Sequence, residues 1–286
     1  MTGPFVTATD LARELESSAP PAVLDASLVL HSPKFDGDYR RDSGLPSWLD
    51  HHIPGSQHVD VAAVFSDTDA PLHYTHQQPQ QIADALAGLG IGADRRVVVY
   101  DSTGTLWAAR LWYLLRWIGH DVRVLDGGLA AWDAEGLPTE SGESVAPSPV
   151  ATWPAREARP AWVTKEELVD RSGEAPLVCG LPAGSFDGSA PTRYSRRGRI
   201  PGSVNVSSRD LFSSDATVKG TGEIVDAYAS AGIDGTEPEV LLYCGGGISA
   251  SANALTLVAI GIDAVRIYDG SLEEWSADPA LPLDVG

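Results

Sequence analysis

The chain has 286 residues, of which 43% are hydrophobic and 21% charged, and its formal net charge is −19. Such a length suits two domains of ordinary size rather than one. The acidic balance argues against a general affinity for nucleic acid or for an anionic membrane surface. The N-terminus lacks the basic and apolar stretches of a signal peptide, no apolar run is long enough to span a membrane, and the 2 cysteines do not make a disulfide framework. We therefore expect a soluble protein of the cytoplasm.

The predicted elements come in the same order in each half of the chain. The first half is expected to hold a strand, a helix, a buried strand and a last strand, at residues 22–24, 80–88, 96–100 and 122–125. The second half is expected to hold the corresponding elements at 177–178, 224–231, 240–243 and 265–268. Apolar strands that alternate with helices are typical of a parallel sheet covered on both faces. We predict an α/β fold, with a mostly parallel sheet flanked by helices in each half.

The two halves are also related in sequence. The apolar block that ends at Asp101 recurs 143 positions later in the block that ends at Cys244, and Asp126 recurs at the same spacing as Asp269. Repeated blocks in constant order indicate duplication of one domain. Between the copies lies a proline-rich, weakly apolar stretch. We predict homologous domains at residues 1–140 and 161–286, joined by an extended surface linker at 141–160.

A glycine-rich loop is the clearest candidate site. It follows the predicted strand at 240–243 and reads Cys244-Gly245-Gly246-Gly247-Ile248-Ser249, where Ser249 is expected to cap a helix that runs to about Ile260. Glycines permit positive φ, so several backbone N–H groups can point at one centre, and the start of a helix favours an anion there. Both effects stabilise a charged sulfur atom on Cys244. The alternative is a buried cysteine in an ordinary tight turn.

Two other chemistries are weighed against this loop and its surroundings. A cysteine phosphatase needs an arginine six positions after its cysteine to bind phosphate, and that position is Ala250. The pairs His51-His52 and His73-x-x-His76 suggest a metal, yet no cysteine or carboxylate completes a ligand set at zinc-like spacing. We predict neither a phosphatase nor a metal site, and no cofactor.

A basic segment precedes the second Ile-Pro-Gly-Ser turn. Four of the chain's 20 basic residues fall between Arg193 and Arg199. In so acidic a chain, this segment is where an anionic substrate would meet dense positive charge. The alternative is a solvated loop with surface arginines.

These motifs together resemble the tandem-domain rhodanese family of sulfurtransferases, over nearly the full length of the chain. The shared marks are His52-Ile53-Pro54-Gly55, Tyr100-Asp101, Asp126-Gly127-Gly128 with Trp132, and the Cys244 loop. The resemblance implies two rhodanese-like domains, the first inactive and the second carrying sulfur as a persulfide on Cys244. The loop is more similar to that of 3-mercaptopyruvate sulfurtransferases than to that of thiosulfate rhodaneses.

The resemblance also implies partners and substrate contacts. The expected partners are a small anionic sulfur donor, with 3-mercaptopyruvate favoured over thiosulfate, and a thiol, cyanide or thioredoxin-like acceptor. By position, Arg193 and then Arg197 match the family's donor-binding arginine. Asp60 and His76 match its first-domain aspartate and histidine, with His73 competing for the second role.

The chain departs from the family at the end of the strand near residue 178. Cys179 stands where the family has an aspartate, and a donor-binding arginine falls on Ser185. Two classes of function therefore stay open: a sulfurtransferase, which we favour, and a weakly active persulfide carrier or binding protein. Cys179 is expected to be a buried packing residue, with a role in resolving the Cys244 persulfide as the alternative.

Overall fold

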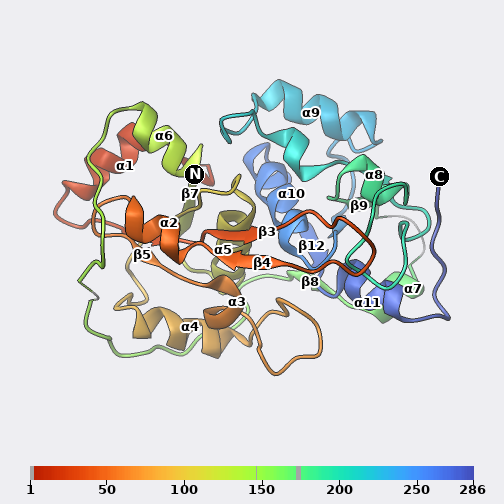
Figure 1. The fold of residues 1–286 in the computed structure, drawn as a ribbon, viewed down its shortest axis with the longest axis horizontal. Helices are drawn as coiled ribbons and strands as arrows, with labels where there is room; N and C mark the ends of the chain where they lie inside the picture. Colours follow the sequence, from red (N-terminus) through yellow and green to blue (C-terminus); the bar gives the residue numbers. More distant parts are fainter. Residues whose placement is uncertain (1–2, 146, 172–174) are drawn as a thin grey trace.

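The computed structural model describes residues 3–145, 147–171 and 175–286, and these form two five-stranded parallel sheets (Figure 1). The first sheet, in the order β1-β7-β6-β2-β5, consists of β1 (Phe5–Val6), β2 (Ala22–Asp25), β5 (Gln57–His58), β6 (Val97–Tyr100) and β7 (Val122–Leu125). The second, in the order β10-β9-β11-β12-β8, consists of β8 (Trp162–Val163), β9 (Leu177–Cys179), β10 (Val204–Asn205), β11 (Val240–Tyr243) and β12 (Val265–Tyr268). Read from opposite ends, the two orders are the same, so the sheets are copies of one design.

Helices surround each sheet. In the first half they are α1 (Ala8–Leu15), α2 (Leu45–Asp50), α3 (Val61–Val64), α4 (Pro79–Gly88), α5 (Leu106–Trp117) and α6 (Gly128–Ala134). In the second half they are α7 (Lys165–Val169), α8 (Ala183–Phe186), the 3₁₀ helix η1 (Ser208–Leu211), α9 (Thr221–Ser230), α10 (Ile248–Ala259) and α11 (Ser271–Ala277). A small antiparallel ribbon of β3 (Leu28–Leu30) and β4 (Arg41–Ser43) adjoins the first sheet's connections. The predicted α/β class, with parallel sheets flanked by helices, is confirmed.

The central strands of both sheets are continuous runs of buried residues, which is why their positions could be predicted from the apolar pattern of the sequence. Every residue of β6 and of β11 is buried, as expected of strands covered on both faces. The strands at 122–125, 240–243 and 265–268 have the predicted bounds, and β2, β6 and β9 differ from prediction by one residue at one end.

The halves meet through their longest helices. Helices α5 and α10 pack against each other, and side chains from both, with the flanking strands, form one apolar cluster shared by the halves. Smaller clusters lie on the far side of each sheet. The carboxyl ends of β6 and β11, where Asp101 and Cys244 stand, lead directly into these two helices. A residue at either position therefore lies close to the contact between the halves.

Two equivalent hydrogen bonds cross this contact in opposite directions. The Val218 N–H donates to Asp126 Oδ1 of the first half at 2.7 Å. The His76 N–H donates to Asp269 Oδ2 of the second half at 2.8 Å. The two aspartates occupy corresponding positions after β7 and β12. Each half thus holds a loop of the other by the same device.

The predicted linker follows the first half. In the part that the structure describes, the Val150 N–H donates to Ala87 O and the Ala158 N–H donates to Trp117 O, so the chain crosses the ends of α4 and α5. We keep 141–160 as its proposed bounds.

Candidate functional site: the Cys244 loop

Cys244 is the first residue after β11. Its side chain is buried, with 2% of the residue exposed. The Cys244 N–H donates to Ser271 Oγ at 3.1 Å, and the N–H groups of Leu272 and Glu273 donate to the carbonyls of Cys244 and Gly245 at 3.2 and 3.0 Å. The first residues of α11 therefore fix the backbone of Cys244 and Gly245 by hydrogen bonds.

The three loop glycines have three different environments. Gly247 has φ +79°, the left-handed conformation that favours glycine, and a side chain there would meet Asp269 and Arg110 at 2.7 and 2.8 Å. Gly245 has no room, because a side chain would coincide with the Tyr194 hydroxyl. Gly246 has ordinary space around it, with its nearest neighbour at 3.6 Å. Positive φ is thus needed at Gly247 and not throughout the loop.

The expected helix cap at Ser249 is wrong. Helix α10 begins at Ile248, and its N-cap is Gly247, which makes no side-chain cap hydrogen bond. The reason is that the chain enters the helix directly from the left-handed turn. Ser249 lies inside the first turn of α10, and its side chain lines a cavity instead.

The Cys244 loop presents a run of backbone N–H groups. Within the described part of the chain, the N–H groups of residues 245–250 donate no hydrogen bond to a protein group. The corresponding loop of the first half shows where such groups point: the N–H groups of Thr103, Thr105, Trp107 and Ala108 all donate to the Asp101 carboxylate at 2.8–3.0 Å. Trp107 and Ala108 are the second and third residues of α5, as Ser249 and Ala250 are of α10. By this correspondence with the Asp101 loop, residues 245–250 form a cradle of backbone N–H groups that suits an anion at Cys244.

The basic segment divides into residues that face a cavity and residues that do not. Arg193 donates from Nη2 to His31 O at 2.6 Å, lies 5.8 Å from the Tyr39 ring, and keeps its buried Nε without a partner among the described residues. Arg197 instead donates to the Asp36 carboxylate at 2.9 Å, and this hydrogen bond lowers the pKa of Asp36. Arg196 donates to the backbone carbonyls of residues 276, 278 and 281, which accounts for it as a structural residue.

The cavity beside Arg193 lies between the two halves. It has a volume of about 310 Å³, and the Cys244 loop contributes Ile248 and Ser249 to its wall. Among the described residues that line it, Arg193 and Arg209 are charged and none is acidic. Ser185, which replaces an arginine of the resembled family, lines the same cavity. A basic cavity in a chain of net charge −19 suits a small anion.

The predicted first-domain contacts do not gather at this cavity. Asp60 caps α3 by accepting the Ala62 N–H at 2.9 Å. The His76 ring stacks on Trp162 with 4.2 Å between centroids. Neither residue, nor Arg197, is among those that line the cavity. All three assignments stay predictions.

His73 lies beside the loop, with its carbonyl oxygen 3.8 Å from where a side chain on Gly246 would begin. Its Nδ1 is 2.5 Å from Oε1 of Glu273, the residue whose N–H holds Gly245 O. Its ring stacks on Tyr39 at 4.3 Å, and its side chain is half exposed. The competing assignment, His73, thus also lies beside the Cys244 loop, and the choice between it and His76 stays a prediction.

Sequence reasoning missed Tyr194, Arg209 and Glu273. The Tyr194 hydroxyl lies against Gly245, and burial, together with the nearby Cys244, raises the pKa of Tyr194, so this hydroxyl stays a hydrogen-bond donor. Tyr194 lies inside the basic segment, which was a usable signal. Arg209 and Glu273 stand among ordinary surface residues of the sequence, and only the fold brings them to the site.

Known proteins with similar sequences show to which family this chain belongs. The family model for the rhodanese-like domain matches residues 7–135 and again 164–278. The chain belongs to the rhodanese family. It is 34% identical to the 3-mercaptopyruvate sulfurtransferase of Homo sapiens over 283 residues, covering 96% of this chain and 90% of the relative. It is 30% identical to a putative thiosulfate sulfurtransferase, SseB, of Mycobacterium tuberculosis over 298 residues, covering 99% and 97%.

A solved rhodanese structure agrees over the whole fold. SseA from Escherichia coli, described as a 3-mercaptopyruvate sulfotransferase, superposes with a TM-score of 0.80 at 28% identity, covering 94% of this chain and 99% of that one. The agreement extends over both rhodanese domains and not only over the one that carries Cys244.

The second cysteine of this rhodanese points away from the first. Cys179 pairs with Tyr243 across β9 and β11, and both side chains belong to the cluster on the far side of the sheet. Cys244 belongs to the shared cluster on the near side. Burial raises the pKa of Cys179 to about 12. These contacts agree with the packing residue that we expected.

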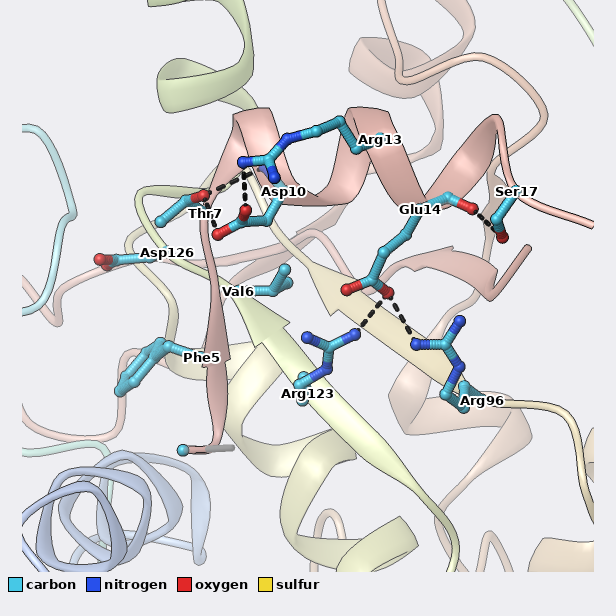
Figure 2. A pocket seen from close by; sticks show the side chains of 11 residues that line it. Phe5, Val6, Thr7, Asp10, Arg13, Glu14, Ser17, Arg96, Arg123 and Asp126 are labelled. Carbon is cyan, nitrogen blue, oxygen red and sulfur yellow. Dashed lines mark hydrogen bonds and ion pairs between the residues drawn. The ribbon is translucent and has the colours of Figure 1, made fainter. Parts of the chain in front are cut away.

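A second cavity lies on the outer side of the first rhodanese domain (Figure 2). Its volume is about 540 Å³, and Figure 2 shows the Glu14 carboxylate of α1 between the guanidinium groups of Arg96 and Arg123. Since Glu14 takes both arginines, this cavity offers less positive charge to an anion than the one beside Cys244. We assign it no function.

The described residues show neither a metal site nor a membrane-spanning helix. They contain no group of three or more His, Cys, Asp or Glu side chains placed to hold a metal ion. None of their helices combines the length and the apolar character needed to cross a bilayer.

Proposed function

We propose that this rhodanese is a sulfurtransferase that takes sulfur from 3-mercaptopyruvate and carries it as a persulfide on Cys244. The observation that carries the proposal is that the backbone N–H groups of residues 245–250, next to a cysteine at the end of β11, have no acceptor among the described residues. Such donors stabilise a thiolate, which is the attacking form of cysteine, and equally a persulfide anion.

The proposed half-reaction is balanced without a cofactor. The Cys244 thiolate attacks the sulfur of 3-mercaptopyruvate, an S–S bond forms, and the C–S bond of the donor breaks. The electron pair of that bond leaves on carbon as the enolate of pyruvate. The proton of the donor's thiol returns to this carbon, so that pyruvate and the Cys244 persulfide anion remain. The Tyr194 hydroxyl, which lies against Gly245, is a suitable group to pass that proton.

The cavity supports a carboxylate donor. Arg193 and Arg209 supply its positive charge, and Ser249 connects its wall to the loop. Thiosulfate would profit from cations within the loop itself, whereas residues 245–247 are glycines. A keto acid can place its sulfur at the loop and its carboxylate on the arginines. The relatives named 3-mercaptopyruvate sulfurtransferases favour the same donor.

The acceptor is proposed as a thiol, cyanide or a thioredoxin-like protein. All three accept sulfur from a persulfide by attack on its outer atom. We propose a reducing compartment, the cytoplasm, because Cys244 has to stay a thiol between turnovers and both cysteines are free.

A donor panel tests the proposal. The measurement is kcat/KM for 3-mercaptopyruvate and for thiosulfate with one acceptor at one ionic strength, together with the mass of the Cys244 peptide after donor alone. We expect the addition of one sulfur atom and a preference for 3-mercaptopyruvate. A preference for thiosulfate of about tenfold, ~1.4 kcal/mol in transition-state binding, would overturn the donor and leave sulfur transfer standing.

The persulfide carrier is the second candidate, and Ser185 favours it, because the cavity lacks an arginine at that position. Formation of the persulfide without steady-state turnover would select the carrier.

Arg209 tests the proposed binding of the donor's carboxylate in the cavity. We expect Arg209→Ala to raise KM for 3-mercaptopyruvate about tenfold while kcat changes little, since the arginine contacts the bound carboxylate before and after sulfur leaves.

A further inference from the structure

An arginine of the first domain reaches the Cys244 loop. Arg110 lies in the middle of α5, and its side chain is fully buried. Its Nη2 donates to Tyr74 O at 2.6 Å and lies 2.8 Å from Asp269 Oδ1 of the second domain. Its guanidinium group also lies 5.3 Å from the Trp162 ring. The domain without the cysteine thus sends a charged group into the domain that has it.

This ion pair touches the loop at its left-handed glycine. A side chain on Gly247 would meet Asp269 Oδ1 at 2.7 Å and Arg110 Nη1 at 2.8 Å. Gly247 is the N-cap of α10, so its orientation sets where the N–H groups of the next residues point. The Arg110–Asp269 pair therefore packs against the left-handed turn at Gly247 and limits the positions that this turn can adopt.

Among the described residues, the first domain has no equivalent ion pair beside its own loop. Its aspartate at the corresponding position, Asp126, accepts the Val218 N–H as Asp269 accepts the His76 N–H. However, the fifth residue of α10, which corresponds to Arg110 in α5, is Ala252. The arginine is present only beside the loop that carries the cysteine.

Burying the charges of Arg110 and Asp269 costs desolvation free energy that their hydrogen bonds do not fully offset. Arg110 Nε and Nη1 and Asp269 Oδ1 are buried without a hydrogen-bond partner in the described part of the chain. Charged groups buried with incomplete hydrogen bonding repay their desolvation poorly, and apolar residues of similar size often serve stability as well. Stability alone is thus a weak reason for a buried arginine here.

We propose that Arg110 is a positioning residue, by which the cysteine-free domain fixes Gly247 and with it the backbone N–H groups that face Cys244. The inference rests on the proposed function of Cys244 for its effect on turnover. Its effect on the cradle is separate, because it concerns the reactivity of the thiol with or without a donor.

The test compares Arg110→Met with Arg116→Met. Arg116 is a matched control, since it also lies on α5 and crosses to the second domain, where it pairs with Asp263 at 2.9 Å away from the loop. Alkylation of Cys244 by iodoacetamide at fixed pH measures the thiolate, and kcat and KM with 3-mercaptopyruvate measure turnover. We expect Arg110→Met to lower the alkylation rate and kcat about tenfold each with KM within about threefold, and Arg116→Met to change neither.

The outcomes are separable. If folded Arg110→Met alkylates at the wild-type rate, the positioning role is overturned. If Arg110→Met does not fold, Asp269→Asn and Arg110→Lys decide by the same readouts, because they keep the shape or the charge of the pair. If the wild type turns over no donor and yet Arg110→Met slows alkylation, the positioning role stands and the proposed function falls.

Discussion

The two domains of this rhodanese place different groups in the same backbone cradle. In the first, the Asp101 carboxylate accepts four backbone N–H groups and fills the cradle permanently. In the second, Cys244 stands at the corresponding strand end, and the N–H groups of residues 245–250 donate to no protein group in the described residues. Burial raises the pKa of Asp101, and the backbone hydrogen bonds from Ala108, Thr103 and Thr105 oppose that rise. The N–H groups of the first loop thus bind a carboxylate of their own loop, whereas those of the second have no such acceptor among the described residues.

The loops also differ in length and in their turn residue. Five residues separate β6 from α5, whereas four separate β11 from α10. The residue before the helix is left-handed in both, at φ +69° for Thr105 and +79° for Gly247. Thr105 shows that a side chain is tolerated in this conformation where no Arg110–Asp269 pair stands against it. The glycine in the second loop is therefore required by its close neighbours more than by its φ.

The largest effect is expected from Cys244→Ser. Serine keeps the size of the side chain but forms no persulfide and is far less acidic, so sulfur transfer should be lost while the melting temperature is kept. Steady-state turnover and circular dichroism check both. Activity above about a tenth of wild type, ~1.4 kcal/mol of barrier, would mean that another group carries the sulfur.

A pair of glycine variants sharpens the comparison between turns. Gly247→Ala adds a methyl group into contacts of 2.7 and 2.8 Å and imposes a left-handed alanine, whereas Gly246→Ala meets its nearest neighbour at 3.6 Å. We expect Gly247→Ala to lower kcat by about tenfold or more and Gly246→Ala to stay within about twofold. Steady-state assays on the two folded variants measure the difference in kcat. Equal loss in the two variants would show that the left-handed turn is not what orients the cradle.

Asp101→Asn tests whether the first loop is purely structural. Each carboxylate oxygen accepts two of the four N–H groups, so the amide, which has an NH2 group in place of one oxygen, loses two of these hydrogen bonds in a site that is 3% exposed. We expect unfolding in urea to become easier by about 1–3 kcal/mol, with kcat within about threefold of wild type. A large loss of kcat at unchanged stability would place Asp101 in the catalytic machinery.

The smallest effect is expected at the second cysteine. With its pKa raised to about 12 by burial, Cys179 stays protonated near neutral pH, and its side chain faces the opposite side of the sheet from Cys244. Cys179→Ala should leave kcat within about twofold. Non-reducing peptide mapping of the wild type after mild oxidation should give no Cys179–Cys244 peptide. Recovery of that peptide would restore the resolving role.

The sequence predicted most of the fold, because apolar strands buried on both faces leave a pattern that needs no partner to be read. It also located Cys244 and its glycines, since a strand end, three glycines and a helix start lie within a few consecutive residues. It failed where the outcome depends on convergence in space. The Ser249 cap was wrong because the left-handed Gly247 already starts α10, and Arg209 and Arg110 carry no local signal. The contact of His73 with Glu273, a residue 200 positions away, likewise carries no local signal in the sequence.

The paired bonds from Val218 to Asp126 and from His76 to Asp269 have the form of an isologous interface, in which each partner offers the other the same surface. If the two domains were separate chains, the fraction of them associated through these hydrogen bonds would depend on their concentration. Joined on one chain, they meet at an effective concentration that dilution cannot lower. An assembly built this way should keep its specific activity at any enzyme concentration, as a free dimer of single domains would not.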